Sequence, residues 1–217
     1  MPQAMPRRPR GRPTKPVLSV TSITDAAIDI ITHHGLSALT MTSLAASLRV
    51  SASALYNHAA SKKDVLMWVQ DKLNLTIDDP DFTSQPWDKA LMEWARSYRE
   101  CFIRHTAMIP VMAVLPVSES PHTLSMYERV ITGLTGAGVH SSTALNMIVA
   151  VEALAFGAAY DATAPAGIFD PGSHTSQAPV FSGAAALRPS EPREAADQAF
   201  EAGLQAMVAG FRSRIGG

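Results

Sequence analysis

The stretch L-T-M-T-S-L-A-A-S-L-R-V-S-A-S-A-L-Y-N-H, Leu39 to His58, decides the fold. Two short helices that cross at a steep angle need apolar residues where they face each other and a small residue at their closest approach. The small residue here is Ala45. The apolar positions are Leu44, Leu48, Val50 and Leu55. This register predicts two short helices packed against each other.

Hydroxyl side chains mark the starts of both helices. Thr40 or Thr42 caps the first helix, and Ser51 or Ser53 caps the second. The second helix opens on small residues, Ser51 to Ala54, which allow a helix backbone to approach base edges in a DNA major groove. A flexible Ser/Ala-rich connector is the alternative, and the apolar register on both sides argues against it.

Further helices are predicted on either side of this pair. Upstream, A-A-I-D-I-I-T-H-H-G spans residues 26–35, with a helical apolar stripe that stops at Gly35. Downstream, Ser61-x-x-Asp64 is typical of a helix N-terminus, with an acidic residue in the first turn. The inner face predicted for that helix consists of Val65, Trp68, Val69, Lys72 and Leu73.

From Ile23 to Leu73 the sequence resembles the N-terminal DNA-binding domain of the TetR family of transcriptional regulators. The most specific match is L-Y-x-H at Leu55 to His58, followed by Lys62. The resemblance implies a homodimeric repressor whose first three helices read a palindromic operator. It also implies a divergent C-terminal domain that binds a small molecule, which displaces the helix after the recognition helix and releases the operator.

The resemblance assigns DNA contacts residue by residue. Tyr56 and Lys62 would each bond a phosphate, while Thr42 and the exposed residues of 52–57 would lie toward base edges. That face has no arginine or glutamine for a bidentate base contact, so specificity must come largely from Asn57, Thr42, the N-terminal arm or DNA shape. The residues predicted to contact DNA in this domain are Thr40, Thr42, Arg49, Ser51, Ala52, Ser53, Tyr56, Asn57, His58 and Lys62.

Arg49 departs from the family pattern, because many members carry glycine directly after the first helix of the pair. If this position is left-handed, arginine costs roughly 1 kcal/mol relative to glycine. Alternatively, the turn is built differently and Arg49 contacts a phosphate. The sequence leaves both interpretations open.

A basic arm precedes the first helix. Residues 1–77 carry nine Lys and Arg against four Asp and Glu, a balance of +5, and the remaining 140 residues carry nine against fifteen, a balance of −6. A basic N-terminal third suits contact with a polyanion. R-G-R-P at residues 10–13 resembles an AT-hook, in which Arg10 and Arg12 would enter a minor groove; a tail that adds only non-specific phosphate affinity is the alternative.

The remaining chain is also helical in its apolar period, which predicts an all-α fold of about nine helices. Ten of the fifteen prolines fall in residues 1–16 and 165–192, so neither segment is expected to form regular helix. The predicted organisation is a disordered arm at 1–19, a helix-turn-helix domain at 20–76, and a ligand-binding and dimerisation domain at 81–217 with a mobile loop at 165–192. Its helices are expected near residues 87–105, 110–116, 121–136, 142–162 and 192–215.

Methionine and aromatic side chains gather on these helices, which favours either ordinary core or a pocket for an apolar or aromatic ligand. Glu152 is notable because it is the only acidic residue in an otherwise apolar turn; it would orient a ligand or make an interhelical or intersubunit hydrogen bond. The residues predicted to bind ligand are Trp94, Tyr98, Phe102, His105, Met112, Met126, Asn146 and Glu152.

The last two long helices carry small residues that allow close packing between two subunits. A dimer also suits operator recognition, since two half-sites need two recognition helices. The predicted dimer interface consists of Gly157, Ala158, Phe200, Gly203, Leu204, Met207 and Phe211.

Composition limits the remaining possibilities. Apolar residues make up 47% of the 217 residues and charged residues 17%, which indicates a globular chain with a sizeable core. A single cysteine, Cys101, excludes an intramolecular disulfide and a cysteine-rich zinc site. We expect no metal, no cofactor and a cytoplasmic location. The apolar stretch 144–164 is interrupted by polar residues, and no membrane span is expected.

Two other classes of function stay open. An enzyme is conceivable because Cys101 and His105 are four residues apart on a predicted helix, although Cys101 lies on its apolar stripe. A helical small-molecule-binding protein that does not read DNA is the other possibility. Tyr56 and Lys62, in register after the helix pair, argue against it.

Overall fold

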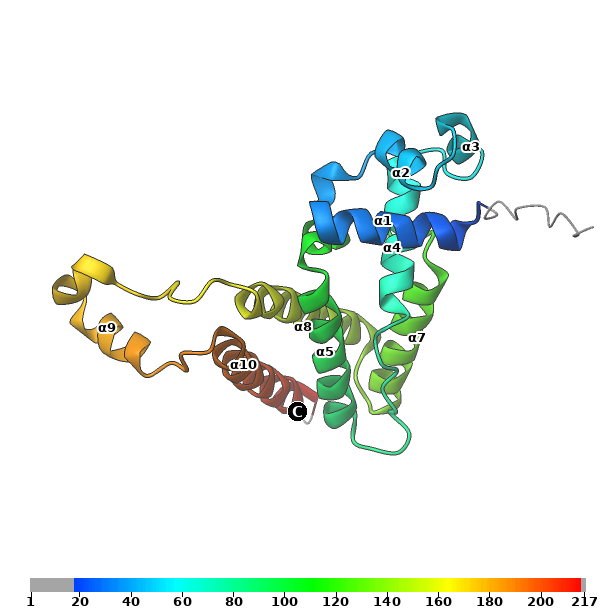
Figure 1. The fold of residues 1–217 in the computed structure, drawn as a ribbon. Helices are drawn as coiled ribbons and strands as arrows, with labels where there is room; N and C mark the ends of the chain where they lie inside the picture. The colour runs from blue at the N-terminus through cyan, green and yellow to red at the C-terminus, as the bar shows by residue number, and fades with distance from the viewer. Residues whose placement is uncertain (1–17, 216–217) are drawn as a thin grey trace, which may run out of the picture.

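The structure is a computed structural model that describes residues 18–215, and these residues form helices and connecting segments without a β-strand. The predicted all-α class is confirmed (Figure 1). The described residues form ten α-helices: α1 (Val20–His34), α2 (Met41–Ser47), α3 (Ala52–Tyr56), α4 (Lys62–Asn74), α5 (Trp87–Arg104), α6 (Ile109–Met112), α7 (Pro121–Gly136), α8 (Ser141–Ala162), α9 (Pro179–Ala186) and α10 (Pro192–Ile215). Three 3₁₀ helices accompany them in this part of the chain: η1 (Leu36–Ala38), η2 (Thr106–Met108) and η3 (Gly172–Gln177).

Side-chain caps set the starts of the four N-terminal helices. Ser19, Thr40 and Ser61 each form a reciprocal capping box with the residue three positions later, and Ser51 accepts the backbone N–H of Ala54. Thr40 rather than Thr42 therefore caps α2, and Ser51 rather than Ser53 caps α3. The short helices do not need high intrinsic propensity, because caps and packing define their ends.

α4 is central to the structure, since it packs against α1 on one side and α7 on another. Two contact surfaces bury more of its circumference than one amphipathic stripe would. Trp68 and Lys72, expected on the inner face, are only half-buried. The buried set is instead Val65, Leu66, Met67, Val69, Gln70, Leu73 and Asn74.

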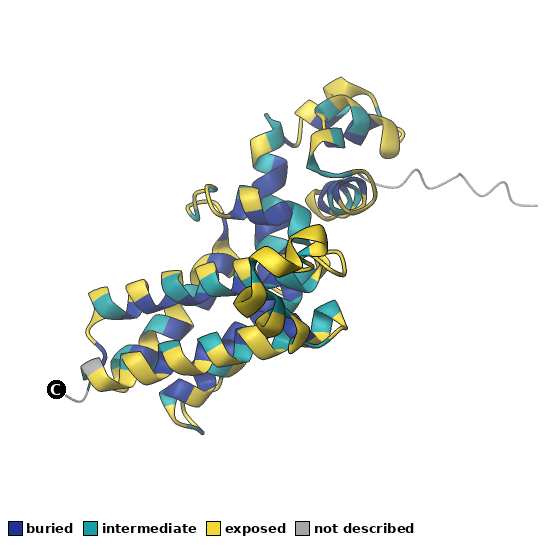
Figure 2. Ribbon diagram, turned by 90° about the vertical axis from the view of Figure 1, so that its left-hand side faces the viewer, coloured by how far each residue is buried: buried dark blue, intermediate teal, exposed yellow. Residues whose placement is uncertain are grey.

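The C-terminal domain is built around α5, α8 and α10. Trp94, Tyr98 and Phe102 of α5 are buried, and the Phe102 ring meets that of Phe156 of α8 edge-on at 4.9 Å between centroids. Figure 2 shows the resulting pattern on the helix that ends at the C-terminus: one side is buried and the opposite side is exposed.

The proline-rich segment 165–192 differs from its prediction, because it contains η3 and the regular helix α9. Pro179 occupies the first turn of α9, where the missing N–H costs no intrahelical bond. In Figure 1 this segment reaches away from the rest of the chain before α10 returns.

α8 meets the length and apolarity of a membrane-spanning helix, although polar residues interrupt it. A third of its most apolar window, 33%, is buried within the fold. Core helices of folded domains satisfy the same criteria, so α8 alone is weak evidence for a membrane span.

Candidate nucleic-acid interface and ligand cavity

The α2–α3 surface presents polar side chains on a small packed core. Leu44 and Leu55 are almost fully buried beneath it. The predicted contact residues from Thr40 to His58 are all exposed, including Tyr56 with 52% of its surface accessible. The structure thus brings this set together on one short helix pair. Arg10 and Arg12 lie outside the described residues.

Arg49 adopts the left-handed conformation, with φ at 57°, and is the only non-glycine residue among those described with a positive φ. Its N–H donates to the Ala46 carbonyl and that of Val50 to the Ala45 carbonyl, both at 3.0 Å. These two hydrogen bonds define the Schellman motif, which normally ends on glycine. Of the two interpretations, the left-handed turn is correct, and the exposed Arg49 side chain also stays available to a phosphate.

Lys62 has a structural partner within the chain. Its Nζ donates to the Leu36 carbonyl of η1 at 3.1 Å, which ties the start of α4 to the turn after α1. The side chain is half-buried, so a phosphate contact would share this amine with the backbone.

A cavity of about 330 Å³ lies where α4, α5, α7 and α8 meet the segment around α6. Of the predicted ligand residues, Tyr98, Met112 and Glu152 line it. The others do not: Trp94, Phe102 and Met126 are buried elsewhere, Asn146 is exposed, and His105 borders a separate small hollow beside α1. The complete lining is Gln70, Asn74, Tyr98, Met112, Ala113, Leu115, Val117, Tyr127, Val149, Glu152, Ala153 and Phe156.

Glu152 is the charged group of this lining. The Tyr127 hydroxyl donates to its Oε1 at 2.7 Å, so the predicted interhelical bond exists and joins α7 to α8. Burial raises the pKa of Glu152 above its ordinary value, and hydrogen bonds from Tyr127 and Tyr98 offset only part of that rise. Burial also raises the pKa of Tyr127, so the phenol remains a donor at neutral pH.

Sequence reasoning missed Gln70 and Asn74 of α4. Both are buried, and Gln70 Oε1 and Asn74 Oδ1 have no hydrogen-bond partner in the described structure. The Asn74 amide orientation is fixed because its Nδ2 donates to Thr123 Oγ1 at 2.8 Å. Two polar residues four apart on an otherwise apolar helix face were the available signal.

α4 connects the DNA-facing helices to this cavity. Asp71 Oδ1 accepts the backbone N–H groups of His122 and Thr123 at 2.8 and 3.0 Å, and so caps the N-terminus of α7. Lys72 pairs with Asp25 of α1. A change in the cavity therefore has a short, hydrogen-bonded route to the N-terminal domain.

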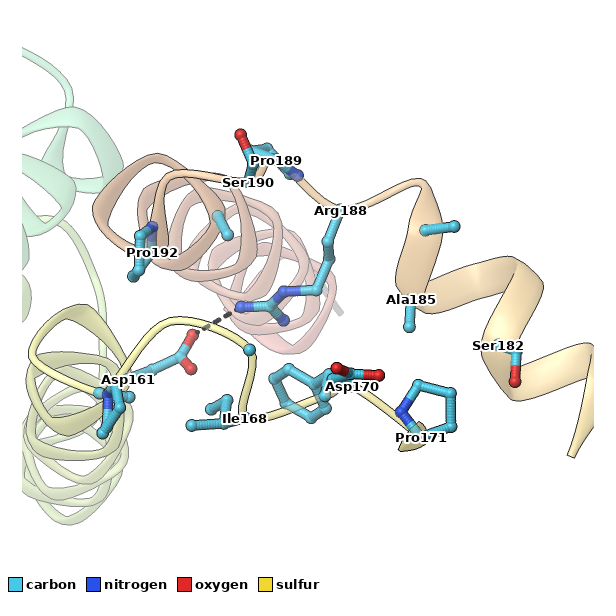
Figure 3. Close-up of a pocket in the computed structure, with 16 residues that line it drawn as sticks. Asp161, Ile168, Asp170, Pro171, Ser182, Ala185, Arg188, Pro189, Ser190 and Pro192 are labelled. Carbon is cyan, nitrogen blue, oxygen red and sulfur yellow. Dashed lines mark hydrogen bonds and ion pairs between the residues drawn. The ribbon is translucent and has the colours of Figure 1, made fainter. Parts of the chain in front are cut away.

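A second hollow of about 400 Å³ lies between the end of α8, α9 and the start of α10. Figure 3 shows Arg188 directed at Asp161, with which it forms a 3.1 Å ion pair. The Arg188 guanidinium also lies over the Phe169 ring at 4.6 Å. These contacts within the chain anchor the segment 165–192, and the cavity beside α4 is the better ligand candidate.

The predicted dimer residues differ in their exposure: two are buried, one is exposed and four are half-buried. Phe200 and Leu204 are 2% and 0% exposed, because their side chains face the subunit's own core, and are not available to a partner. Gly157 is exposed, with no atom within 4 Å of an added Cβ, whereas Gly203 lies against Leu154. Ala158, Met207 and Phe211 are partly buried against the core. Exposed small or apolar residues remain along α8 and α10: Val149, Ala153, Gly157, Tyr160, Ala199, Ala202, Ala206 and Gly210.

The positions of Cys101 and His105 do not support the enzyme hypothesis. Cys101 is fully buried, its thiol donates to the Leu73 carbonyl, and burial raises its pKa. His105 lies beyond the end of α5 in a non-helical conformation, which removes the helical spacing to Cys101. Among the described residues, no three His, Cys, Asp or Glu side chains are arranged to hold a metal ion.

A helix-turn-helix domain joined by one helix to a helical domain with a ligand-sized cavity is the architecture of a one-component helix-turn-helix regulator. Family comparison agrees: "Bacterial regulatory proteins, tetR family" matches residues 23–67, and "Tetracyclin repressor-like, C-terminal domain" matches residues 79–215. The chain therefore belongs to the TetR family.

Individual relatives are distant. The HTH-type transcriptional repressor DrrR1 of Streptomyces coeruleorubidus is 27% identical over 70% of this chain and 56% of its own length. An HTH-type transcriptional regulator of Saccharopolyspora erythraea matches over 52% of its length, so this chain spans about half of these two relatives. The tetracycline repressor protein class E of Escherichia coli is 23% identical over 91% of this chain and 92% of its own.

Solved structures share the fold. The crystal structure of apo ActR from Streptomyces coelicolor has a TM-score of 0.76 at 24% identity, covering 92% of this chain and 97% of that one. BioQ of Mycobacterium smegmatis has a TM-score of 0.64 at 23% identity, over 89% of this chain and 97% of that one. A structure of BioQ with its double-stranded DNA operator has a TM-score of 0.62 at 22% identity, over 89% and 97% of the two chains.

Proposed function

We propose that this protein is a transcriptional repressor that binds a palindromic operator as a homodimer and is released by a small molecule in the α4–α8 cavity. The observation that carries the proposal is the position of α4: its N-terminus adjoins the α2–α3 surface, and its C-terminal half lines the cavity. A ligand that changes the packing of Gln70 or Asn74 therefore acts on the helix that packs on α1, and α1 in turn contacts α2, which packs against α3. Relatives described as repressors and the DNA complex of BioQ support the DNA-reading half.

In this proposal the two parts of the chain divide the work. Residues 20–76 read DNA, with Tyr56 and Arg49 on phosphates and Thr42, Ser53 and Asn57 nearest the bases. Residues 81–217 bind the ligand together with Gln70 and Asn74 of α4. They also form the dimer through the exposed small-residue face of α8 and α10, which suits close packing with a second copy. The protein acts in the cytoplasm, where its DNA is, and catalyses no reaction.

The test is selection of binding sites from random duplex DNA with the full chain. An enriched palindrome with two half-sites about one helical turn apart is the expected result. A thermal-shift screen of small molecules then identifies ligands, since a compound that binds the native state raises its apparent stability. Each hit is added to the protein–operator complex, and release of DNA is the expected response.

Absence of any enriched sequence above bulk duplex affinity would refute the DNA-reading proposal. Ligands that bind but leave the operator complex intact would refute the release mechanism alone.

A further inference from the structure

The α4–α8 cavity carries charge of one sign. Glu152 is acidic, and none of the twelve lining residues is lysine, arginine or histidine. Among the ion pairs of the described residues, none includes Glu152; its polar partners are the phenols of Tyr127 and Tyr98. A carboxylate that is largely withdrawn from water is costly without a cation, and the cavity lining itself supplies no positive group here.

Two lining residues of α4 add acceptor atoms that have no partner. Gln70 Oε1 and Asn74 Oδ1 are buried without a partner, and they lie one helical turn apart on α4. A carbonyl oxygen can only accept a hydrogen bond. Both oxygens are closed off from solvent, so a ligand with N–H or O–H donors would bond them after a small rotation of these side chains toward the cavity.

Aromatic rings complete the lining. Tyr98, Tyr127 and Phe156 come from three different helices, and the rings of Tyr98 and Phe156 pack with 5.5 Å between centroids. Ring faces attract cations, and they also accommodate flat apolar bodies. This lining therefore favours a ligand with positive charge and disfavours one with negative charge, because it combines a carboxylate, carbonyl oxygens and aromatic rings.

We propose that the ligand of this cavity is an organic cation: an apolar or aromatic body carrying a protonated amine. The amine pairs with Glu152, and its remaining N–H groups bond the amide oxygens of α4. This inference rests on the proposed function only in treating the cavity as the effector site. A neutral polyhydroxylated ligand would satisfy Gln70 and Asn74 but would leave the Glu152 charge uncompensated.

The test uses three probes with one apolar body and different charge: 2-naphthylmethylamine, 2-naphthylmethanol and 2-naphthoate. Binding to the full chain is measured by isothermal titration calorimetry at neutral pH. The amine is expected to bind at least about tenfold more tightly than the alcohol, as a buried charge-assisted hydrogen bond warrants, and the carboxylate more weakly than both.

Two matched variants assign the preference to one residue. Glu152→Gln keeps the size and an acceptor for Tyr127 but removes the charge, and it should abolish the preference for the amine over the alcohol. Glu128→Gln, on the exposed side of α7, should leave it unchanged. Glu152→Gln should also unfold at no lower temperature than the parent without ligand, which verifies that the variant is folded.

An amine that fails to bind, or binds no better than the alcohol, overturns the inference. A preference that survives Glu152→Gln overturns it as well. Operator release is measured separately with the same amine: binding without release leaves the inference intact and contradicts the proposed regulation.

Discussion

The α2–α3 surface and the α4–α8 cavity handle polar side chains in opposite ways. On the α2–α3 surface, the capping hydroxyls of Thr40 and Ser51 accept backbone N–H groups three residues away. In the cavity, polar groups come from helices far apart in sequence, and Gln70 and Asn74 have unpartnered oxygens. A surface for a rigid, repeating target can be complete by itself, whereas a cavity that must respond to ligand keeps bonds unmade until the ligand arrives.

The largest effect is expected from truncating a side chain in the core beneath the α2–α3 surface. Leu55 is fully buried, so Leu55→Ala should lower the free energy of unfolding by about 2–5 kcal/mol. Thermal or urea unfolding measures this decrease, and operator binding should fail with it. Leu75→Ala, at an exposed position on the chain just after α4, is the control; equal destabilisation of both variants would contradict the assignment of Leu55 to the core.

Deleting residues 1–16 tests whether the surface is sufficient without the basic arm. Operator affinity should fall, and the slope of log affinity against log salt should shrink by about 0.9 for each phosphate that the arm neutralises in the full chain. An AT-hook predicts a greater decrease in affinity on A·T-rich flanks than on G·C-rich flanks. A slope identical to that of the full chain would show that the arm does not touch DNA.

Tyr56→Phe tests whether the surface positions DNA through its phosphates. Removal of one hydroxyl per subunit should cost about 1–2 kcal/mol for a dimer, near a tenfold weaker complex, with little change in sequence preference. Binding to a panel of operator variants measures both quantities. A changed base preference would place Tyr56 at base edges instead.

The smallest effect is expected for Arg49→Gly, which relieves local backbone strain and also removes one positive charge from the α2–α3 surface. Glycine at this left-handed position should stabilise the fold by about 1 kcal/mol. Operator affinity should nonetheless fall because the guanidinium is removed. Arg49→Ala removes the charge but keeps the Cβ, so it should share the decrease in affinity without the gain in stability. Wild-type affinity in both variants would exclude a phosphate contact.

Local features of this fold were predictable, because local chemistry determines them. The cap of α4, the short list of candidates for the caps of α2 and α3, and the bounds of α7 and α10 follow from hydroxyls, proline and helical period. The orientations of Phe200 and Leu204 did not follow, since α10 carries apolar or small residues around most of its circumference. The cavity lining was not predicted for a related reason. Gln70 and Asn74 become cavity residues only once α4 is placed between α1 and α7.

The cap that Asp71 provides for α7 has a mechanical consequence. With Lys72 paired to Asp25 and Lys62 bonded to Leu36, α4 is tied by side chains to α1 and η1 as well as to α7, so sliding it past either neighbour would break these hydrogen bonds. From this group of helices, the Tyr127–Glu152 hydrogen bond crosses from α7 to α8. A ligand that competes for Glu152 acts on that crossing point. By thermodynamic reciprocity, bound operator must then weaken ligand affinity by the same factor by which ligand weakens operator binding.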